Sequence, residues 1–474
     1  LNKKITPIIP ESFIDPSGER LKLKILDKYT FQLHSSVSYG GLIAELTYQG
    51  WASYSTLIKP AHYLKKFHAK YTSMEKFKPY LEEEQLNDEW WELFEIKDVE
   101  KTELTNREAI GFPVLYPWMR IEGPGSMMIF ERNPYYFGVD TAGNQLPYID
   151  KITSKKVSDV EMMQMKAITG EVDYMGADYT ALAKLPLYKE NERKGNYITK
   201  ILGKHHLPAI FFINYTYDDP VWREVTGDVR FRKALSLAID RQEIIDSIFL
   251  KMSSNPERIS LPGEYNPDMS RKLLEEMGMN KKDDNGYRLA PGGEQFELFI
   301  EVAPRSPDMI PITELLVEYF DAIGIRTRMK QISPELESQK RSANKIQSTI
   351  VWCPEPQWRR ELKNDYLPGV RDRVGPLWWL WRESNGREGI EPPDGVKEIY
   401  NLHDKRQYYI PQSAKDKNIM DKIYKIHKEQ YYFIWLVGPT NDPLIVNKKL
   451  RNIPQNEVWT HEACDSGEQF FFEK

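Results

Sequence analysis

Residues 228–249, Asp228-Val-Arg-Phe-Arg-Lys-Ala-Leu-Ser-Leu-Ala-Ile-Asp-Arg-Gln-Glu-Ile-Ile-Asp-Ser-Ile-Phe249, predict two helices in tandem. Asp228 and Asp240 each stand where a carboxylate can accept hydrogen bonds from the free N–H groups of a first helical turn. Glu243 follows Asp240 by three residues, so it is placed to bond back in an aspartate variant of the capping box. Apolar residues at helical spacing define one buried face on each helix: Phe231, Leu235, Ala238, Ile239, Ile244, Ile245 and Ile248.

The residue pattern of this stretch resembles the signature of the family 5 extracellular solute-binding proteins, the substrate receptors of peptide, nickel and oligosaccharide ABC importers. The family phrase is an Asn, a short turn containing Pro, and then Asp-Val-Arg-x-Arg-x-Ala-x-x-x-Ala-x-Asp-Arg. Here Asn214 and Asp219-Pro220 precede Asp228 in that order. Three earlier segments also resemble family phrases and stand in the family's order: Arg132-Asn-Pro-Tyr-Tyr-Phe137, Leu146-Pro-Tyr-Ile-Asp150 and Gly170-Glu-Val-Asp173.

The length and composition of the chain limit the classes of protein to which it can belong. The chain has 474 residues, enough for two or three domains, and a net charge of -5 with no dominant basic block, so no nucleic-acid partner is expected. The longest strongly apolar run, residues 431–437, is far shorter than the roughly 20 residues that a membrane span needs. Cys353 and Cys464 are the two cysteines, and nothing in their spacing demands a disulfide.

The start of the chain carries no signal segment and no lipid-anchor cysteine. The resemblance implies that residues 1–60 correspond to a later part of a first lobe. We therefore expect a fragment or a processed form, with any lipid anchor lying outside this chain.

Helix and strand patterns follow one another along the rest of the sequence. Residues 159–169 predict a helix with Met162, Met165 and Ile168 inward, and Asn266-Pro267 begins another with Met269, Leu273 and Met277 inward. Residues 296–302, 310–323 and 325–332 predict a strand, a helix and a parallel strand with a right-handed crossover. Residues 353–395 show little periodicity, and so long a loop is typically functional.

The fold class that the resemblance implies is α/β, a two-lobed periplasmic-binding-protein-like (type II) fold with two crossing strands between the lobes. Lobe 1 is expected to hold residues 1–210, incomplete at its N-terminus. Lobe 2 is expected to hold residues 214–436, and residues 440–474 should return to lobe 1. The first crossing strand is expected within residues 208–216, and residues 444–446 predict a strand in the returning segment.

Catalytic and metal-binding motifs are missing from the sequence. It contains no His-Glu-x-x-His, no Gly-x-x-x-x-Gly-Lys and no Gly-x-Ser-x-Gly. His205 and His206 would point to opposite faces of a strand, and His461 with Cys464 has no second pair to complete a zinc site. We therefore predict no catalytic residue, no metal and no cofactor. The alternative class is a secreted carbohydrate-active enzyme, a glycoside hydrolase, for which the 70 acidic residues give only unspecific support.

Candidate ligand-binding residues are aromatic or polar and lie near predicted strand ends. Trp352-Cys-Pro-Glu-Pro-Gln-Trp358 follows a strand, where ligands meet an open α/β sheet. The resemblance implies that this phrase faces the cleft and that its acidic residue holds the amino group of a peptide, although Glu355 replaces the usual Asp. Of the three Trp in residues 377–381, at least one should be exposed. The candidates are Trp352, Glu355, Trp358, Trp378, Trp379, Trp381, Asn214 and Tyr215.

The resemblance implies an extracytoplasmic substrate-binding receptor of an ABC importer, either periplasmic or lipid-anchored at the outer face of the membrane. A peptide or an oligosaccharide would bind between the lobes and pass to the permease subunits. The alternative for each Trp candidate is an ordinary place in the core, because most aromatic residues pack there. We expect a monomer.

Overall fold

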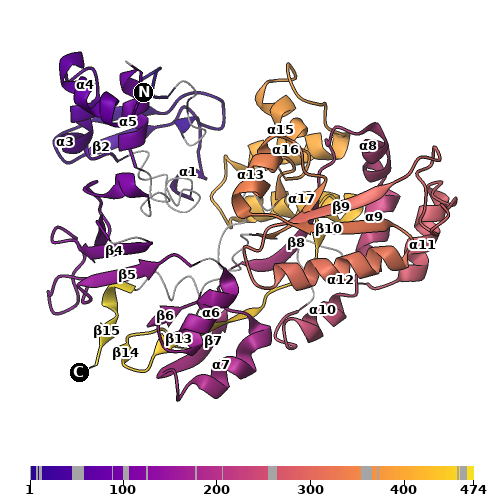
Figure 1. Cartoon of the computed structure of the whole chain (residues 1–474). Coiled ribbons are helices and arrows are strands. Elements are labelled where there is room, and N and C mark those ends of the chain that lie inside the picture. Colours follow the sequence, from indigo (N-terminus) through magenta and orange to yellow (C-terminus); the bar gives the residue numbers. More distant parts are fainter. Residues whose placement is uncertain are drawn as a thin grey trace.

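The computed structural model describes most of the chain (Figure 1). The described residues are 2–6, 9, 13–44, 58–87, 89–99, 106–123, 126–157, 159–176, 179–204, 206–254, 264–353, 366–370, 373–455, 458 and 467–473. Within them, no helix is both long and apolar enough to cross a bilayer.

A five-stranded sheet forms the centre of one lobe. Its order is β10 (Arg326–Gln331), β9 (Glu297–Val302), β11 (Ser348–Cys353), β8 (Leu207–Ile213) and β12 (Ile434–Trp435). β9 and β10 pair in parallel and are joined by α12 (Met309–Ala322), so the predicted strand–helix–strand unit is confirmed. β11 and β12 both run antiparallel to β8. We call this sheet and the helices packed on it the five-stranded lobe.

Helices pack against this sheet and bury its central strand. They are α8 (Pro220–Gly227), α9 (Val229–Ala238), α10 (Arg241–Ser247), α11 (Pro267–Glu276), α13 (Pro334–Ser342), α15 (Pro376–Glu383), α16 (Asp394–Arg406) and α17 (Ala414–Gln430). Every residue of β8 is buried, as expected for a strand with helices on both faces. One continuous apolar cluster extends from β8 through α9 and α12 to β12.

The tandem helices predicted from residues 228–249 are confirmed as α9 and α10. The carboxylate of Asp228 accepts from the N–H of Arg230 at 2.7 Å, and that of Asp240 accepts from the N–H of Glu243 at 3.0 Å. All seven apolar residues expected on the inner faces are buried. The Glu243 carboxylate, expected to bond back to its cap, instead accepts from the hydroxyl of Tyr319 at 2.8 Å, a partner brought in by α12.

A three-stranded sheet lies in the other lobe, in the order β6 (Tyr174–Met175), β13 (Asn441–Asn447) and β7 (Tyr197–Gly203). Its middle strand comes from the C-terminal part of the chain and runs antiparallel to both neighbours. The strand predicted at residues 444–446 therefore exists within β13 and pairs with residues more than 200 positions earlier. α6 (Val160–Ile168), η6 (Leu182–Lys184) and α7 (Leu185–Asn191) belong to the same lobe (Figure 1).

The N-terminal region, by which we mean the described residues up to 155, contains short elements with a small core of their own. An antiparallel sheet runs through β3 (Trp118–Ile121), β4 (Met127–Arg132) and β5 (Lys151–Lys155). The remaining elements are β1 (Lys22–Ile25), β2 (Phe31–His34), α1 (Leu42–Ala44), α3 (Ala61–Leu64), η3 (Lys65–Phe67), α4 (Met74–Glu83), α5 (Trp90–Lys97) and η5 (Arg107–Ala109). Near the C-terminus, η8 (Gly467–Gln469) follows the strand β14 (Leu450–Arg451), and β14 pairs with β15 (Phe471–Phe472).

Two helices have inward faces that differ from the prediction. In α6, Met162 and Met165 are 44% and 55% exposed, whereas Gln164 is buried and its side chain accepts from Lys184 Nζ at 2.6 Å. In α11, Met269 is 41% exposed, and Ser270 faces inward. The Ser270 hydroxyl donates to the carbonyl of Ala234 at 2.8 Å, so its small side chain lets α11 approach α9 closely.

Two other predictions also need correction. Part of the zone 353–395 that was expected to be a loop forms α15, whose N-cap Gly375 has φ of 68°, a left-handed conformation that glycine adopts without steric cost. Of the strand expected at 431–437, only β12 pairs in the sheet, because Tyr431 ends α17 with φ of 53°.

Candidate functional site

Two connections join the lobes, one between β7 and β8 and the other between β12 and β13. They run side by side, because the backbone N–H of Lys204 donates to the carbonyl of Thr440 at 2.8 Å. The second connection is also tied to the segment after α10. Gly438 N–H donates to the Ser254 carbonyl at 2.7 Å, and the Thr440 hydroxyl donates to the Met252 carbonyl at 3.2 Å. Two connections are present, as expected for the fold, but the first lies before Leu207 and not within residues 208–216, because β8 pairs within the five-stranded sheet.

Lys204 places a buried positive charge between these connections. Its Nζ lies 3.3 Å from Asp308 Oδ2 and 3.8 Å from Asp442 Oδ1, and all three side chains are almost inaccessible to solvent. Asp308 directly precedes α12 in the five-stranded lobe, whereas Asp442 lies on β13 in the other. Burial, with a smaller contribution from these two carboxylates, raises the pKa of the nearby Tyr188 hydroxyl to about 12. Sequence reasoning missed this cluster because its members are far apart in the chain.

Trp352 lies next to the first connection, near the end of the pairing between β11 and β8. It stacks on the buried ring of His206, with ring centroids 5.1 Å apart and planes 28° apart, and it is only partly buried. Two residues of β8, Pro208 and Ala209, stand opposite Trp352 alone. This irregularity follows from Pro208, which has no N–H to donate to the ladder, and such bulges re-aim side chains near functional sites.

Glu355 and Trp358 lie outside the described residues, as do His205, His461 and Cys464. Their predicted roles stay predictions.

The three tryptophans of α15 have different surroundings. Trp378 is 7% exposed and stacks on Tyr215, with centroids 5.3 Å and planes 12° apart. Trp379 and Trp381 are partly exposed. The Arg382 guanidinium lies 5.2 Å from the ring centroid of Trp379, and the ammonium of Lys397 lies 5.8 Å from that of Trp381. Two of the three tryptophans of α15 are thus partly exposed, each beside a cation.

Asn214 and Tyr215 lie in the interior of the five-stranded lobe, 3% and 4% exposed. Asn214 Nδ2 donates to Asn344 Oδ1 at 2.7 Å and to the Ile346 carbonyl at 3.0 Å, which holds the chain entering β11. The Tyr215 hydroxyl donates to the Tyr432 carbonyl at 3.1 Å. Both side chains therefore join strand ends within this lobe.

The arginines of the signature phrase have architectural partners. Arg232 donates to the carbonyls of Thr226 and Gly227 at 2.8 and 2.7 Å, and its Nε donates to the Gln430 carbonyl at 2.7 Å. Arg241 is 2% exposed and donates from Nε to the Trp435 carbonyl at 2.9 Å and from Nη1 to the Ser236 carbonyl at 2.9 Å. These guanidinium groups satisfy helix and strand ends that would otherwise be buried without partners.

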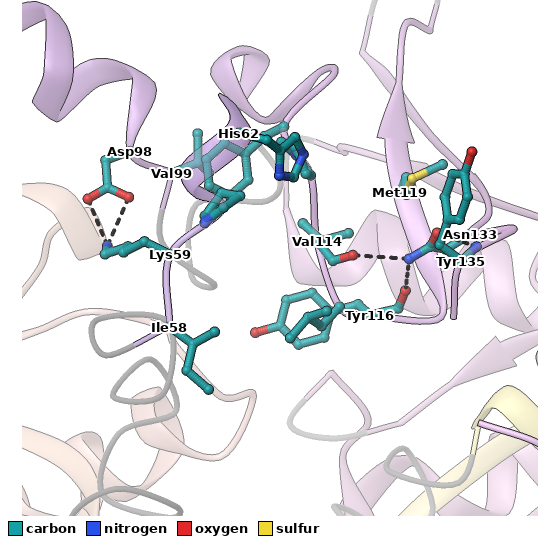
Figure 2. Close-up of a pocket in the computed structure, with 14 residues that line it drawn as sticks. Ile58, Lys59, His62, Asp98, Val99, Val114, Tyr116, Met119, Asn133 and Tyr135 are labelled. Atoms are coloured by element: carbon teal, nitrogen blue, oxygen red, sulfur yellow. Dashed lines mark hydrogen bonds and ion pairs between the residues drawn. The ribbon is translucent and has the colours of Figure 1, made fainter. Parts of the chain in front are cut away.

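A cavity of about 600 Å³ opens in the N-terminal region, between α3 and the β3–β4 sheet (Figure 2). Most of its surface is apolar, and Lys59 and Asp98 form an ion pair at 2.7 Å on one side. On the opposite side Asn133, 2% exposed, donates to the carbonyls of Val114 and Tyr116 at 3.1 and 2.9 Å. The Arg-Asn-Pro-Tyr-Tyr phrase that contains Asn133 was the signal in the sequence that could have drawn attention here.

Metal ligands are not gathered anywhere in the described part of the chain. No group of three or more His, Cys, Asp or Glu side chains could hold an ion there. Several buried carboxylates pair instead with cations, as Glu337 does with Arg305 at 2.7 Å and Asp416 does with Arg406 at 2.6 Å.

Comparison with known proteins gives concordant matches. The chain is 23% identical over 501 residues to a periplasmic alpha-galactoside-binding protein of Rhizobium meliloti (strain 1021), a match that covers 96% of this chain and 64% of that protein. The chain thus spans 64% of the length of this curated relative.

Two solved structures extend the comparison. An oligopeptide-binding protein OppA is 29% identical, with a TM-score of 0.60 and coverage of 100% of this chain and 78% of that one. The periplasmic binding protein MelB from agrobacterium fabrum C58, in complex with stachyose, has a TM-score of 0.68 at 19% identity, covering 98% and 68%, and supports the fold alone.

The fold of this chain is accordingly the two-lobed α/β fold of type II periplasmic binding proteins. Residues 11–354 match the model of the bacterial extracellular solute-binding proteins, family 5, and this match covers most of the chain. The chain belongs to that family.

Proposed function

We propose that this chain is the substrate-binding receptor of an ABC importer, which captures a peptide or an oligosaccharide between its two lobes and delivers it to a membrane permease. The observation that carries this proposal is the pair of crossing connections with the partly exposed Trp352 beside them. A ligand that contacts both lobes would favour a closed arrangement, and two short connections are where such a motion is absorbed. No covalent step is required.

We further propose that the lobes divide along the sheets. β7 and β13 would belong to lobe 1, and β8 and β12 to lobe 2. The boundary expected at residues 210–214 then moves to the connection before Leu207, because all of β8 pairs within the five-stranded sheet. The second boundary falls between Trp435 and Asn441.

An oligosaccharide is supported by the aromatic surfaces. Trp352, Trp379 and Trp381 are each partly exposed, and flat indole faces suit sugar rings. The similarity to an alpha-galactoside-binding protein over 96% of the chain points the same way. A peptide is supported by the 29% identity to an oligopeptide-binding protein, and Glu355 remains our candidate for holding its amino group.

Titration calorimetry with stachyose and with a defined tetrapeptide would test the two ligands directly. If the sugar is the ligand, stachyose binds and Trp352→Ala weakens it by about 1–3 kcal/mol, the range for losing one aromatic stacking platform. If the peptide is the ligand, Glu355→Gln abolishes its binding. Native mass spectrometry of freshly purified protein would identify a ligand carried through purification, and binding of neither class would contradict the proposal.

A binding role is also distinguishable from catalysis. The family and the similar structures are binding proteins, and we propose that this chain has no enzymatic activity. Incubation with stachyose followed by a reducing-end assay should show no turnover. Sustained product formation would favour the glycoside hydrolase alternative instead.

Members of this family are extracytoplasmic, and we propose the same location for this chain, in a periplasm or anchored by lipid at the outer face of the membrane. We propose that it acts as a monomer with the permease as its protein partner. Fractionation of cells that express the whole gene and chemical crosslinking to the membrane fraction would test location and partner together.

A further inference from the structure

The buried cluster of Lys204, Asp308 and Asp442 lies where both lobes and both crossing connections meet. Lys204 is the residue after β7, and its backbone is already bonded to Thr440 of the second connection. Its side chain reaches a carboxylate from each lobe, at 3.3 Å to Asp308 and 3.8 Å to Asp442. Among the ion pairs of the described residues, no other fully buried cation joins these two lobes.

The two carboxylates of this cluster differ in whether their pairing with Lys204 joins the lobes. Asp442 shares the three-stranded sheet with β7, so its pairing with Lys204 stays within one lobe. Asp308 lies in the five-stranded lobe, where the Ser306 hydroxyl donates to the same Oδ2 at 3.2 Å. Of these two pairs, Lys204–Asp308 is therefore the one that bridges the lobes and resists their relative movement.

Because the Lys204–Asp308 pair is buried, separating its two charges costs more free energy than separating a surface pair. A surface ion pair contributes little because water replaces each partner. Here the Lys204 side chain has 0% exposure and the carboxylates 5% and 3%, so separating Lys204 from Asp308 would expose or strand a charge in a poorly solvated interior. The pair thus opposes a relative rotation of the two lobes that would separate Lys204 from Asp308.

We propose that Lys204 positions the two lobes relative to one another, and that its ion pair with Asp308 restrains the angle between them. The stacked pair His206–Trp352 begins two residues further along the same connection. A ligand that contacts Trp352 would therefore lie close to the Lys204–Asp308 pair, which restrains the angle between the lobes. The inference rests on the two-lobed fold and not on the identity of the ligand.

Two matched variants separate this role from a purely structural one. Asp308→Asn removes the attraction between lobes but leaves Lys204 paired with Asp442. Asp442→Asn removes the same charge from the same cation but leaves the pair between lobes intact. The whole chain, without added ligand, would be compared by hydrogen exchange at the amides of Lys204, Gly438, Thr440 and Asn441, and by small-angle X-ray scattering.

Asp308→Asn should accelerate exchange at these amides about tenfold and change the scattering profile, whereas Asp442→Asn should leave both close to those of the original chain. Equal exchange in the two variants, or no acceleration in Asp308→Asn, would overturn the proposal. If Asp308→Asn does not fold by circular dichroism, Ser306→Ala keeps both charges and removes only the hydroxyl that orients Asp308, and it should give a smaller acceleration at the same amides. Because no ligand is added, failure here would leave the receptor proposal untouched.

Discussion

The five-stranded lobe and the N-terminal region of the same chain are stabilised very differently. In the lobe, Phe211 on β8 is fully buried within one continuous apolar cluster, and a buried arginine, Arg241, is satisfied by surrounding carbonyls. In the N-terminal region, Ile25 and Tyr29 of the β1–β2 hairpin are 73% and 86% exposed, and a cavity separates α3 from the β3–β4 sheet.

This difference shows what the family signature encodes. Its capping aspartates and buried arginines lie where the five-stranded lobe joins its helices to its strand ends, not where a ligand would touch solvent-exposed side chains. The partly exposed tryptophans Trp352, Trp379 and Trp381 lie outside residues 228–249. A sequence signature can thus identify a family through its architecture while leaving the ligand open.

Replacing a signature arginine should have the largest effect. Arg241→Met removes a buried cation whose pKa burial lowers to about 10, so it remains charged at neutral pH. It leaves the carbonyls of Ser236 and Trp435 without donors. We expect a loss of about 3–5 kcal/mol in the free energy of unfolding of this lobe, measured by urea denaturation.

The matched control is Arg230→Met, in the same phrase. Arg230 is partly exposed and pairs with Asp228 at 2.6 Å, so its removal should change stability little. Equal losses for the two arginines would contradict the architectural role of Arg241.

Acid should weaken the five-stranded lobe through His427. Burial lowers the pKa of His427 to about 4 from an ordinary 6.5, while its Nε2 lies 2.8 Å from the Tyr366 carbonyl. Because the unfolded chain binds the proton more tightly, the stabilisation is complete above pH 6.5 and is lost as pH falls toward 4. The total is about 3 kcal/mol.

His427→Gln retains an N–H for the Tyr366 carbonyl but cannot titrate. The difference in unfolding free energy between the original chain and this variant, measured from pH 7.5 to 4, should therefore shrink as the pH falls. Parallel pH profiles would show that His427 does not contribute in this way.

In the N-terminal region, Asn133→Ala should cost about 2 kcal/mol, because the carbonyls of Val114 and Tyr116 each lose a donor. Hydrogen exchange should localise the effect to 113–135, beside the cavity. Asn144→Ala, in an exposed turn nearby, serves as the control and should leave exchange in that range unchanged.

The smallest effect is expected at the hairpin. Phe31→Ala should change the free energy of unfolding by no more than about 0.5 kcal/mol, since this ring is 48% exposed. Phe211→Ala, the same substitution in β8, should cost about 3–5 kcal/mol through lost burial and a residual cavity. A large loss for Phe31→Ala would mean that the N-terminal region is better packed than this comparison implies.

Local signals in the sequence were sufficient for much of the fold. The caps at Asp228 and Asp240, the strand–helix–strand unit around α12 and the strand within β13 all follow from spacing over a few residues. These features depend on hydrogen bonds and periodicity close in sequence, which residue types report directly. The family resemblance then implied the two lobes and two crossing connections.

The inward face of a helix was less predictable. Met162 and Met269 match an apolar stripe as well as their neighbours do, yet both lie exposed. Their helices turn Gln164 and Ser270 inward because Lys184 and the Ala234 carbonyl, distant in sequence, supply hydrogen-bond partners. Likewise, the pattern of three tryptophans could not show that Trp378 would stack on Tyr215 while its neighbours reach solvent.

The sequence by itself thus indicated the family, much of the order of helices and strands and the ends of several of them, because those depend on short-range chemistry. Only the tertiary structure decided which polar groups meet. Lys204, Asp308 and Asp442 are separated by more than 100 residues at each step, and nothing local marks them as partners. Their meeting depends on how two sheets are joined, which is a property of the whole chain.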